Sequence, residues 1–282
     1  MQTPGYWSQR LCLESLYGES TPETMFSNPE HIEDLTHQNL FDYTKNHLAG
    51  NNAMLFVSGD YNDHTISLID NSFLALTTKQ LNQTNTPTTK PNKPTQSITK
   101  HLPHSNQISL CMAKNFDRVS HTMFPQLSLL NLFLGGFFGS RLMQDLREEK
   151  GLTYGIGSNI SLSCTGHTWM ITGEMNNQNA ELTQSCIREI LNGLSSNPPM
   201  GEELEKAKLY YGGQLRGSMD GPFSEPGRIQ FLLKTGYPHD YYKTVLNTVW
   251  ETKTDTLAEL AYNYLQPDSF TIALAGATGI SN

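Results

Sequence analysis

The spacing of apolar residues along the chain alternates between the two periods that mark secondary structure. A period near 3.6 predicts an amphipathic helix, and strict alternation predicts a half-buried strand. By these criteria we expect helices over about residues 36–48, 124–134, 140–150, 186–194, 204–215, 225–235, 240–250 and 254–265. We expect strands at 53–60, 107–116, 153–163, 167–175 and 270–277, the third and fourth forming a long antiparallel hairpin.

Strands and helices in this mixed order indicate an α+β fold with helices packed on one face of an antiparallel sheet. Only 16% of the 282 residues are charged, and Asn, Gln, Ser and Thr fill the shortfall, so a folded chain with a polar surface is expected. The net charge of −8 argues against nonspecific binding to nucleic acid or to an anionic membrane.

The sequence predicts a soluble chain whose compartment, cytoplasmic or periplasmic, stays open. No apolar run approaches the roughly 18 residues of a membrane span, and the first residues show no secretory signal. The four cysteines lie far apart without a C-x-x-C pair, and buried reduced thiols are the expected interpretation.

The clearest shift in composition lies at residues 81–100, which read LNQTNTPTTKPNKPTQSITK. Only Leu81 and Ile98 are apolar there, and three prolines interrupt regular pairing, so the segment is predicted to be an exposed linker. The predicted domains are therefore residues 1–80 and 101–282.

Two residues near the middle of the chain could stabilise negative charge. Arg147 lies in the last turn of the helix expected over 140–150, and Tyr154 begins the next strand, with Lys150-Gly151 breaking the helix between them. Their side chains could converge, and a guanidinium and a phenol are donors suited to the oxyanion of a tetrahedral acyl intermediate. In the structural alternative, Arg147 complements the helix dipole and Tyr154 packs in the sheet.

The segment GGFFGSRLMQDLREEKGLTYGIGS, residues 135–158, resembles the second domain of the M16 peptidases, the pitrilysin, insulin-degrading and mitochondrial processing peptidase family. That family has a glycine-rich turn, an S-R-L, a helix ending R-E-x-x-G and a tyrosine in this order. The resemblance continues through residues 218–242 to the terminal strand. Upstream, residues 16–62 resemble the end of a preceding M16 domain, so residues 1–80 would be its C-terminal remnant.

This resemblance implies a two-layer M16/LuxS-like metalloenzyme fold and roles for particular residues. In catalytic members an H-x-x-E-H helix and a distal glutamate bind zinc in the first domain, and the second domain lends an arginine and a tyrosine to the substrate side. By spacing, Arg147 and Tyr154 match that pair. Gly135, Gly136 and Gly139 would form a flexible turn near the peptide, although glycines also serve in a plain helix–helix connection.

The zinc motif itself is missing from the sequence. None of the nine histidines belongs to an H-x-x-E-H, and neither His101-x-x-His104 nor His31-x-Glu33 makes a convincing site. Because a hydrolytic zinc needs about three protein ligands and an open position, we expect no metal in this chain and no hydrolysis by it alone. An independent metallopeptidase with unusual ligands is therefore disfavoured.

Two explanations for the missing motif stay open: a truncated first domain, or a natural metal-free subunit. On either explanation, the expected function is the non-zinc half of an M16-type peptidase. It would work on unfolded peptides with a zinc-bearing subunit or upstream domain. The alternative is a non-catalytic binding or assembly subunit with the same fold. Since residues 1–80 would supply only part of a layered domain, self-association or a partner is expected at that end.

Overall fold

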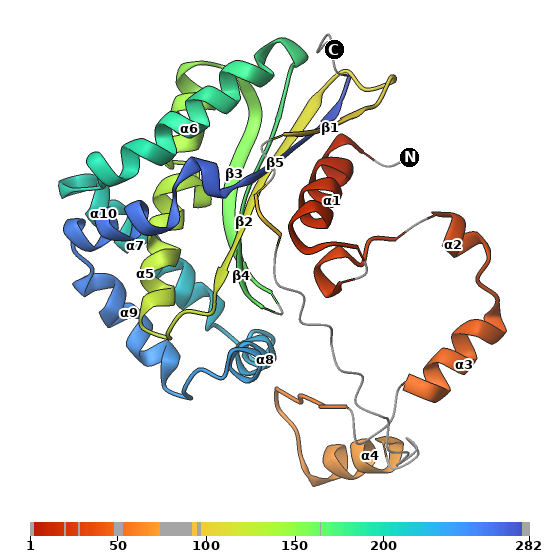
Figure 1. The fold of residues 1–282 in the computed structure, drawn as a ribbon. Coiled ribbons are helices and arrows are strands. Elements are labelled where there is room, and N and C mark those ends of the chain that lie inside the picture. Colours follow the sequence, from red (N-terminus) through yellow and green to blue (C-terminus); the bar gives the residue numbers. More distant parts are fainter. Residues whose placement is uncertain are drawn as a thin grey trace. The chain divides into compact units, whose positions relative to one another are not determined.

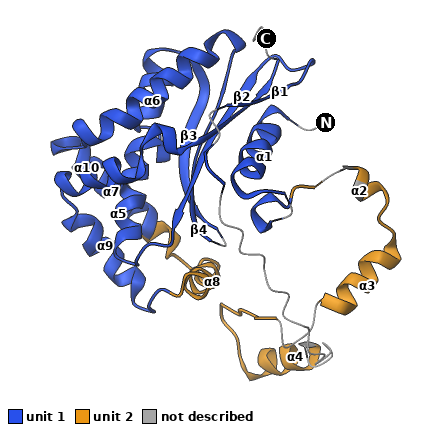
Figure 2. Cartoon of the chain, viewed as in Figure 1, with its two compact units in different colours: residues 1–25, 88–215, 237–282 blue, residues 26–87, 216–236 orange. Residues whose placement is uncertain are grey.

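The computed structural model describes residues 3–19, 21–27, 29–47, 53–73, 92–94, 97–163 and 165–277. The chain forms two compact units (Figure 2): one holds residues 1–25, 88–215 and 237–282, the other residues 26–87 and 216–236. This division differs from the predicted boundary at residue 80, because the first residues pack on the sheet of the first unit. Most of the predicted linker lies outside the described residues.

The first unit is built on a five-stranded sheet with the strand order β1-β5-β2-β4-β3 (Figure 1). β1 is parallel to β5, and the other neighbours are antiparallel. The strands are β1 (Ile98–His101), β2 (Ile108–Asp117), β3 (Thr153–Leu162), β4 (Gly166–Met175) and β5 (Thr271–Gly276). The predicted α+β fold is confirmed, as is the hairpin of β3 and β4, whereas β1 was expected to be linker.

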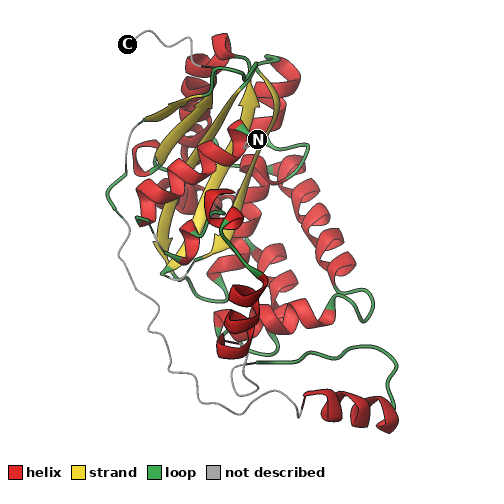
Figure 3. Cartoon of the chain, turned by 90° about the vertical axis from the view of Figure 1, so that its right-hand side faces the viewer, coloured by secondary structure: helices red, strands yellow, loops and turns green. Residues whose placement is uncertain are grey.

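A layer of helices covers one face of this sheet (Figures 1 and 3). Its elements are α5 (Met123–Asn131), the π-helical segments η3 (Leu132–Gly136) and η4 (Met143–Glu149), α6 (Ala180–Ser196), α7 (Gly201–Ser218), α9 (Tyr241–Glu251) and α10 (Thr254–Tyr264). Trp169, Phe133 and Leu110 are among the largest fully buried side chains of the unit. Of the helices that the structure describes, none combines the length and the apolar character that crossing a bilayer requires.

The opposite face of the sheet carries α1 (Pro4–Tyr17), a helix that the sequence reasoning missed (Figure 1). The Thr3 side chain caps its first turn, Pro4 occupies the first helical position, and the helix ends at Gly18, whose φ is 82°. Cys12 and Leu16 pack against β2 and β5 in one buried cluster. This helix therefore gives the sheet a second covered face.

The second unit contains α2 (Pro29–Glu33), α3 (His37–His47), α4 (Asp63–Phe73) and α8 (Glu225–Thr235). The strand expected at 53–60 is wrong, because residues 53–58 form no strand in the structure. A strand needs a neighbour for its N–H and C=O groups, and the described part of this unit contains none. Large apolar side chains here are exposed, among them Leu40, Phe41, Tyr43, Met54, Leu55 and Ile66. Self-association or a partner at this end stays a prediction.

Candidate functional site

Arg147 lies in the π-helical segment η4, where the backbone turn is wider than in an α-helix. The N–H of Lys150 donates to the carbonyl of Asp145, five residues back, at 3.0 Å. Such turns occur frequently at functional sites. The Arg147 side chain is 40% exposed and pairs with Glu148 at 3.2 Å. A surface ion pair of this kind contributes at most about 1 kcal/mol, so the guanidinium keeps donors for another acceptor.

An aromatic ring that the sequence reasoning did not single out lies beside Arg147. The centre of the Phe138 ring is 5.7 Å from the guanidinium carbon of Arg147, and Phe138 is 61% exposed. A cation over an aromatic face at an exposed site gains about 0.5–1 kcal/mol. The turn between η3 and η4 thus presents an apolar ring next to the exposed charge.

The glycines of this turn have different surroundings. Gly135 is buried, and a Cβ added to it would lie 2.6 Å from the backbone nitrogen of Ser158 and 2.9 Å from the Leu142 side chain. Gly136 is half-buried and Gly139 is exposed. Gly135 therefore allows the turn to approach β3 closely, which fits a connection between helices. The peptide contact expected of the three glycines stays a prediction.

Tyr154 is presented by a β-bulge at the start of β3. Thr153 and Gly155 pair with consecutive residues of β4, so Tyr154 is the extra residue between them. A bulge re-aims a side chain and is common beside active sites. The Tyr154 side chain is 57% exposed, and its hydroxyl donates a hydrogen bond to Oδ1 of Asn176 at 3.0 Å. The structural alternative expected the Tyr154 side chain to pack in the sheet, and its exposure shows that it does not.

The backbone ties the helix end that carries Arg147 to the strand start that carries Tyr154. The N–H of Leu152 donates to the carbonyl of Leu146 at 2.8 Å, and Gly151, with φ of 59°, makes the left-handed turn between them. The end of the helix at Lys150-Gly151 is therefore where the sequence predicted it. A direct convergence of the Arg147 and Tyr154 side chains stays a prediction.

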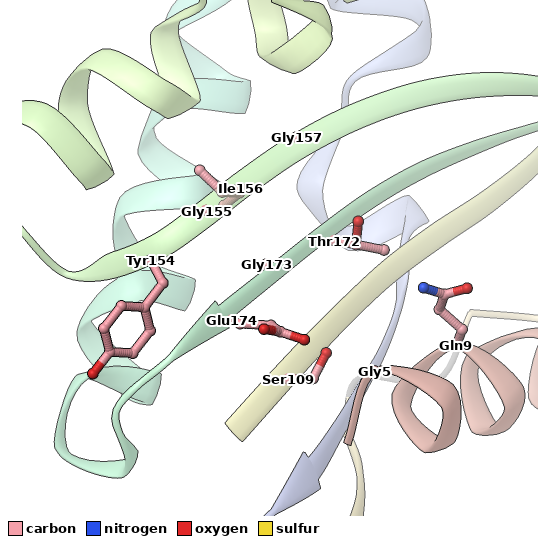
Figure 4. Close-up of a pocket in the computed structure, with 10 residues that line it drawn as sticks. All are labelled: Gly5, Gln9, Ser109, Tyr154, Gly155, Ile156, Gly157, Thr172, Gly173 and Glu174. Carbon is pink, nitrogen blue, oxygen red and sulfur yellow. The ribbon is translucent and has the colours of Figure 1, made fainter. Parts of the chain in front are cut away.

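A cavity of about 440 Å³ adjoins Tyr154 on the face of the sheet that carries α1 (Figure 4). Strands β2, β3 and β4 form its floor, and the start of α1 forms one wall. Figure 4 shows Glu174 and Ser109 beside each other on neighbouring strands. The Ser109 hydroxyl forms a hydrogen bond with the Ser8 hydroxyl at 3.0 Å. The charge among the lining residues comes from the exposed carboxylate of Glu174.

Metal ligands were not expected in this chain. In the part of the chain that the structure describes, no three His, Cys, Asp or Glu side chains gather into a group able to hold a metal ion. The full sequence contains no H-x-x-E-H, and the absence of a metal from this chain stays a prediction.

Comparisons with known proteins agree with the predicted family and fold. The family model described as "Peptidase M16 inactive domain" matches residues 34–211. A relative named "Uncharacterized zinc protease YmxG", from Bacillus subtilis strain 168, is 26% identical over 274 residues. That match covers 95% of this chain and 65% of the relative, so the chain spans less than two thirds of the relative's length.

Solved structures give the same picture of the fold. The structure described as a peptidase M16 inactive domain from Pseudomonas fluorescens has a TM-score of 0.83 at 24% identity, covering 100% of this chain and 68% of that one. A protease from Helicobacter pylori has a TM-score of 0.81 at 16% identity, covering 98% and 67%. At these identities the structural likeness shows the fold alone.

Proposed function

The chain belongs to the M16 peptidase family, in the part described as its inactive domain, and from this premise we propose that it acts as the non-zinc half of an M16-type peptidase. A zinc-bearing half, carried by another subunit or by an upstream domain, holds the hydrolytic centre. This chain contributes contacts to an unfolded peptide and to the transition state. It does not hydrolyse peptides by itself.

The pair of exposed hydrogen-bond donors carries this proposal. Arg147 and Tyr154 each lie at an irregular point of an element, a π-helical segment and a β-bulge. Neither side chain is used in the core of the chain. A donor aimed at a developing oxyanion can raise the rate about a hundredfold, which corresponds to about 2.7 kcal/mol. An exposed ion pair or hydrogen bond contributes at most about 1 kcal/mol to the free energy of unfolding.

The chemistry assigned to these residues is donation to negatively charged substrate oxygen. The guanidinium of Arg147 has five N–H groups, and it forms an ion pair with the half-exposed carboxylate of Glu148. The hydroxyl of Tyr154 has a single proton, which points to Asn176. Rotation about the C–O bond moves that proton to a substrate oxygen while the ring stays in place. Because Asn176 is exposed, water then satisfies its oxygen and the exchange costs little.

The test mixes the purified chain with a zinc-bearing M16 subunit that carries H-x-x-E-H and measures cleavage of an unstructured fluorogenic peptide. We expect no cleavage by this chain alone and activity in the mixture. Arg147→Ala and Tyr154→Phe should each lower kcat/KM by about tenfold to a hundredfold. Arg188→Ala is the matched control, because Arg188 also forms an exposed ion pair, with Asp268 at 2.8 Å.

Each result of this test has a different consequence. Full activity in both Arg147→Ala and Tyr154→Phe would remove the role assigned to them. A stable but inactive complex would favour the alternative of a binding or assembly subunit. Cleavage by the isolated, homogeneous chain would contradict the division of labour between the two halves.

A further inference from the structure

We propose that the turn Asn176–Asn179, between β4 and α6, is the positioning device for Tyr154 and for the helix end that carries Arg147. This inference rests on the function proposed above and adds two positioning residues, Asn176 and Asn179, to it. Neither residue is expected to touch the substrate. Both would act through the segment between Leu146 and Tyr154.

The first contact acts on the Tyr154 side chain. As the extra residue of a bulge, Tyr154 has no partner in the strand register that fixes its direction. Its exposed ring would otherwise exchange between rotamers. The hydrogen bond from its hydroxyl to Oδ1 of Asn176, at 3.0 Å, holds the far end of the ring. Asn176 thus selects one ring position before a substrate arrives.

The second contact acts on the backbone before Tyr154. The side-chain amide of Asn179 donates to the carbonyl of Leu152 at 3.2 Å. The N–H of the same residue, Leu152, donates to the carbonyl of Leu146, next to Arg147. Leu152 is therefore held on one side by the turn and on the other by the helix end, and its side chain is buried.

The turn itself is anchored to the helical layer. The N–H of Asn179 donates to the carbonyl of Asn176 at 3.0 Å, closing the short helix η5 (Asn177–Asn179). α6 begins at Ala180, and Ala180 and Thr183 are buried in its first turn. A side chain held by this turn is consequently held relative to the core.

Three substitutions separate this role from general stability. Asn176→Ala removes the acceptor for Tyr154, and Asn179→Asp keeps the shape of the side chain but cannot donate to the Leu152 carbonyl. Gln178→Ala, an exposed position of the same turn, is the matched control. In the mixture with the zinc-bearing subunit we expect the first two variants to lower kcat about fivefold to tenfold with little change in KM. The control should match the wild type.

Two further measurements make the inference decisive. In a Tyr154→Phe background, Asn176→Ala should cause no additional loss, because its partner hydroxyl is already gone. Independently of activity, the isolated chain labelled with ring-¹³C tyrosine should show a Tyr154 NMR signal, identified by its absence in Tyr154→Phe. Asn176→Ala and Asn179→Asp should shift that signal toward the position of a mobile ring, whereas Gln178→Ala should not.

The outcomes distinguish this inference from the proposed function. An unchanged Tyr154 signal in both asparagine variants would overturn the positioning role, whatever the activity. A mixture that is inactive with the wild-type chain would sink the proposed function, and the ring signal would still decide whether the turn positions Tyr154. Additive losses in the double variant would show that Asn176 acts on something other than Tyr154.

Discussion

The close contact between Gly135 and strand β3 gives a prediction for the stability of Gly135→Ala. The added methyl group would lie 2.6 Å from the Ser158 backbone nitrogen, 2.8 Å from the Ser158 hydroxyl oxygen and 2.9 Å from a methyl carbon of Leu142. The φ angle of Gly135 is not positive, so alanine is allowed by the backbone. The substitution therefore isolates packing from conformational strain.

The magnitude follows from what can move. The nearest atom belongs to the backbone of β3, where the Asn131 side chain also donates to the Ser158 carbonyl at 3.1 Å. Shifting the strand would weaken that bond, so we place the cost at the upper part of the usual overpacking range, about 2–3 kcal/mol. Replacing a helical glycine by alanine returns about 1 kcal/mol. The expected net loss is about 1–2 kcal/mol.

The assay is urea unfolding followed by circular dichroism, with Gly193→Ala as the matched control. Gly193 lies inside α6, and an added Cβ there meets nothing within 4 Å. The same chemical change should therefore stabilise the chain at this position, by about 0.5–1 kcal/mol. If Gly135→Ala is as stable as the wild type, the close contact with β3 is not present in solution.

Further predictions concern buried groups and the cap of α1. Burial, with the positive charge of Arg118, lowers the pKa of His167 to about 4. An unfolded histidine titrates near pH 6.5, so between pH 6.5 and pH 4 the unfolded chain binds a proton that the folded chain does not. The free energy of unfolding should therefore be highest above pH 6.5 and fall by about 3 kcal/mol toward pH 4. Urea unfolding of His167→Phe should lack this pH-dependent fall. Cys12 and Cys111 are both fully buried, and a hydrogen bond with Cys12 together with burial raises the pKa of Cys111. Iodoacetamide should therefore label neither thiol before unfolding, as judged by peptide mass spectrometry. Thr3→Ala should cost about 1 kcal/mol in urea unfolding and Thr3→Ser much less, because a hydroxyl cap is kept.

Apart from α1 and β1, the sequence predicted the strands and helices of the first unit well, because their apolar periodicity reflects burial. β4 is an example, since His167–Met175 alternates and its inward-facing Trp169 and Ile171 are fully buried. The strand at 53–60 failed for the opposite reason. Its residues are apolar enough for a strand, but pairing depends on a neighbour, and an apolar run alone does not supply one.

The candidate site was predictable in its residue types and not in its geometry. The break at Gly151 follows from the sequence, because a left-handed turn favours glycine. The π-helical segment and the bulge each depend on one extra residue in a hydrogen-bond register, and no residue type marks that. The contacts of Asn176 and Asn179 join positions 22 and 27 residues apart, so local spacing could not reveal them.

Stability alone gives a poor account of the Arg147 and Tyr154 contacts. The Arg147 pair with Glu148 is a surface ion pair worth at most about 1 kcal/mol, and the Tyr154 bond with Asn176 joins two exposed side chains. Substituting either donor should therefore leave the free energy of unfolding within about 1 kcal/mol of the wild type. An unfolding curve that hardly changes, together with a large loss of activity in the mixed complex, is the combination that a role toward substrate requires. A large loss of stability in Arg147→Ala or in Tyr154→Phe would instead make the substituted side chain part of the scaffold of this chain.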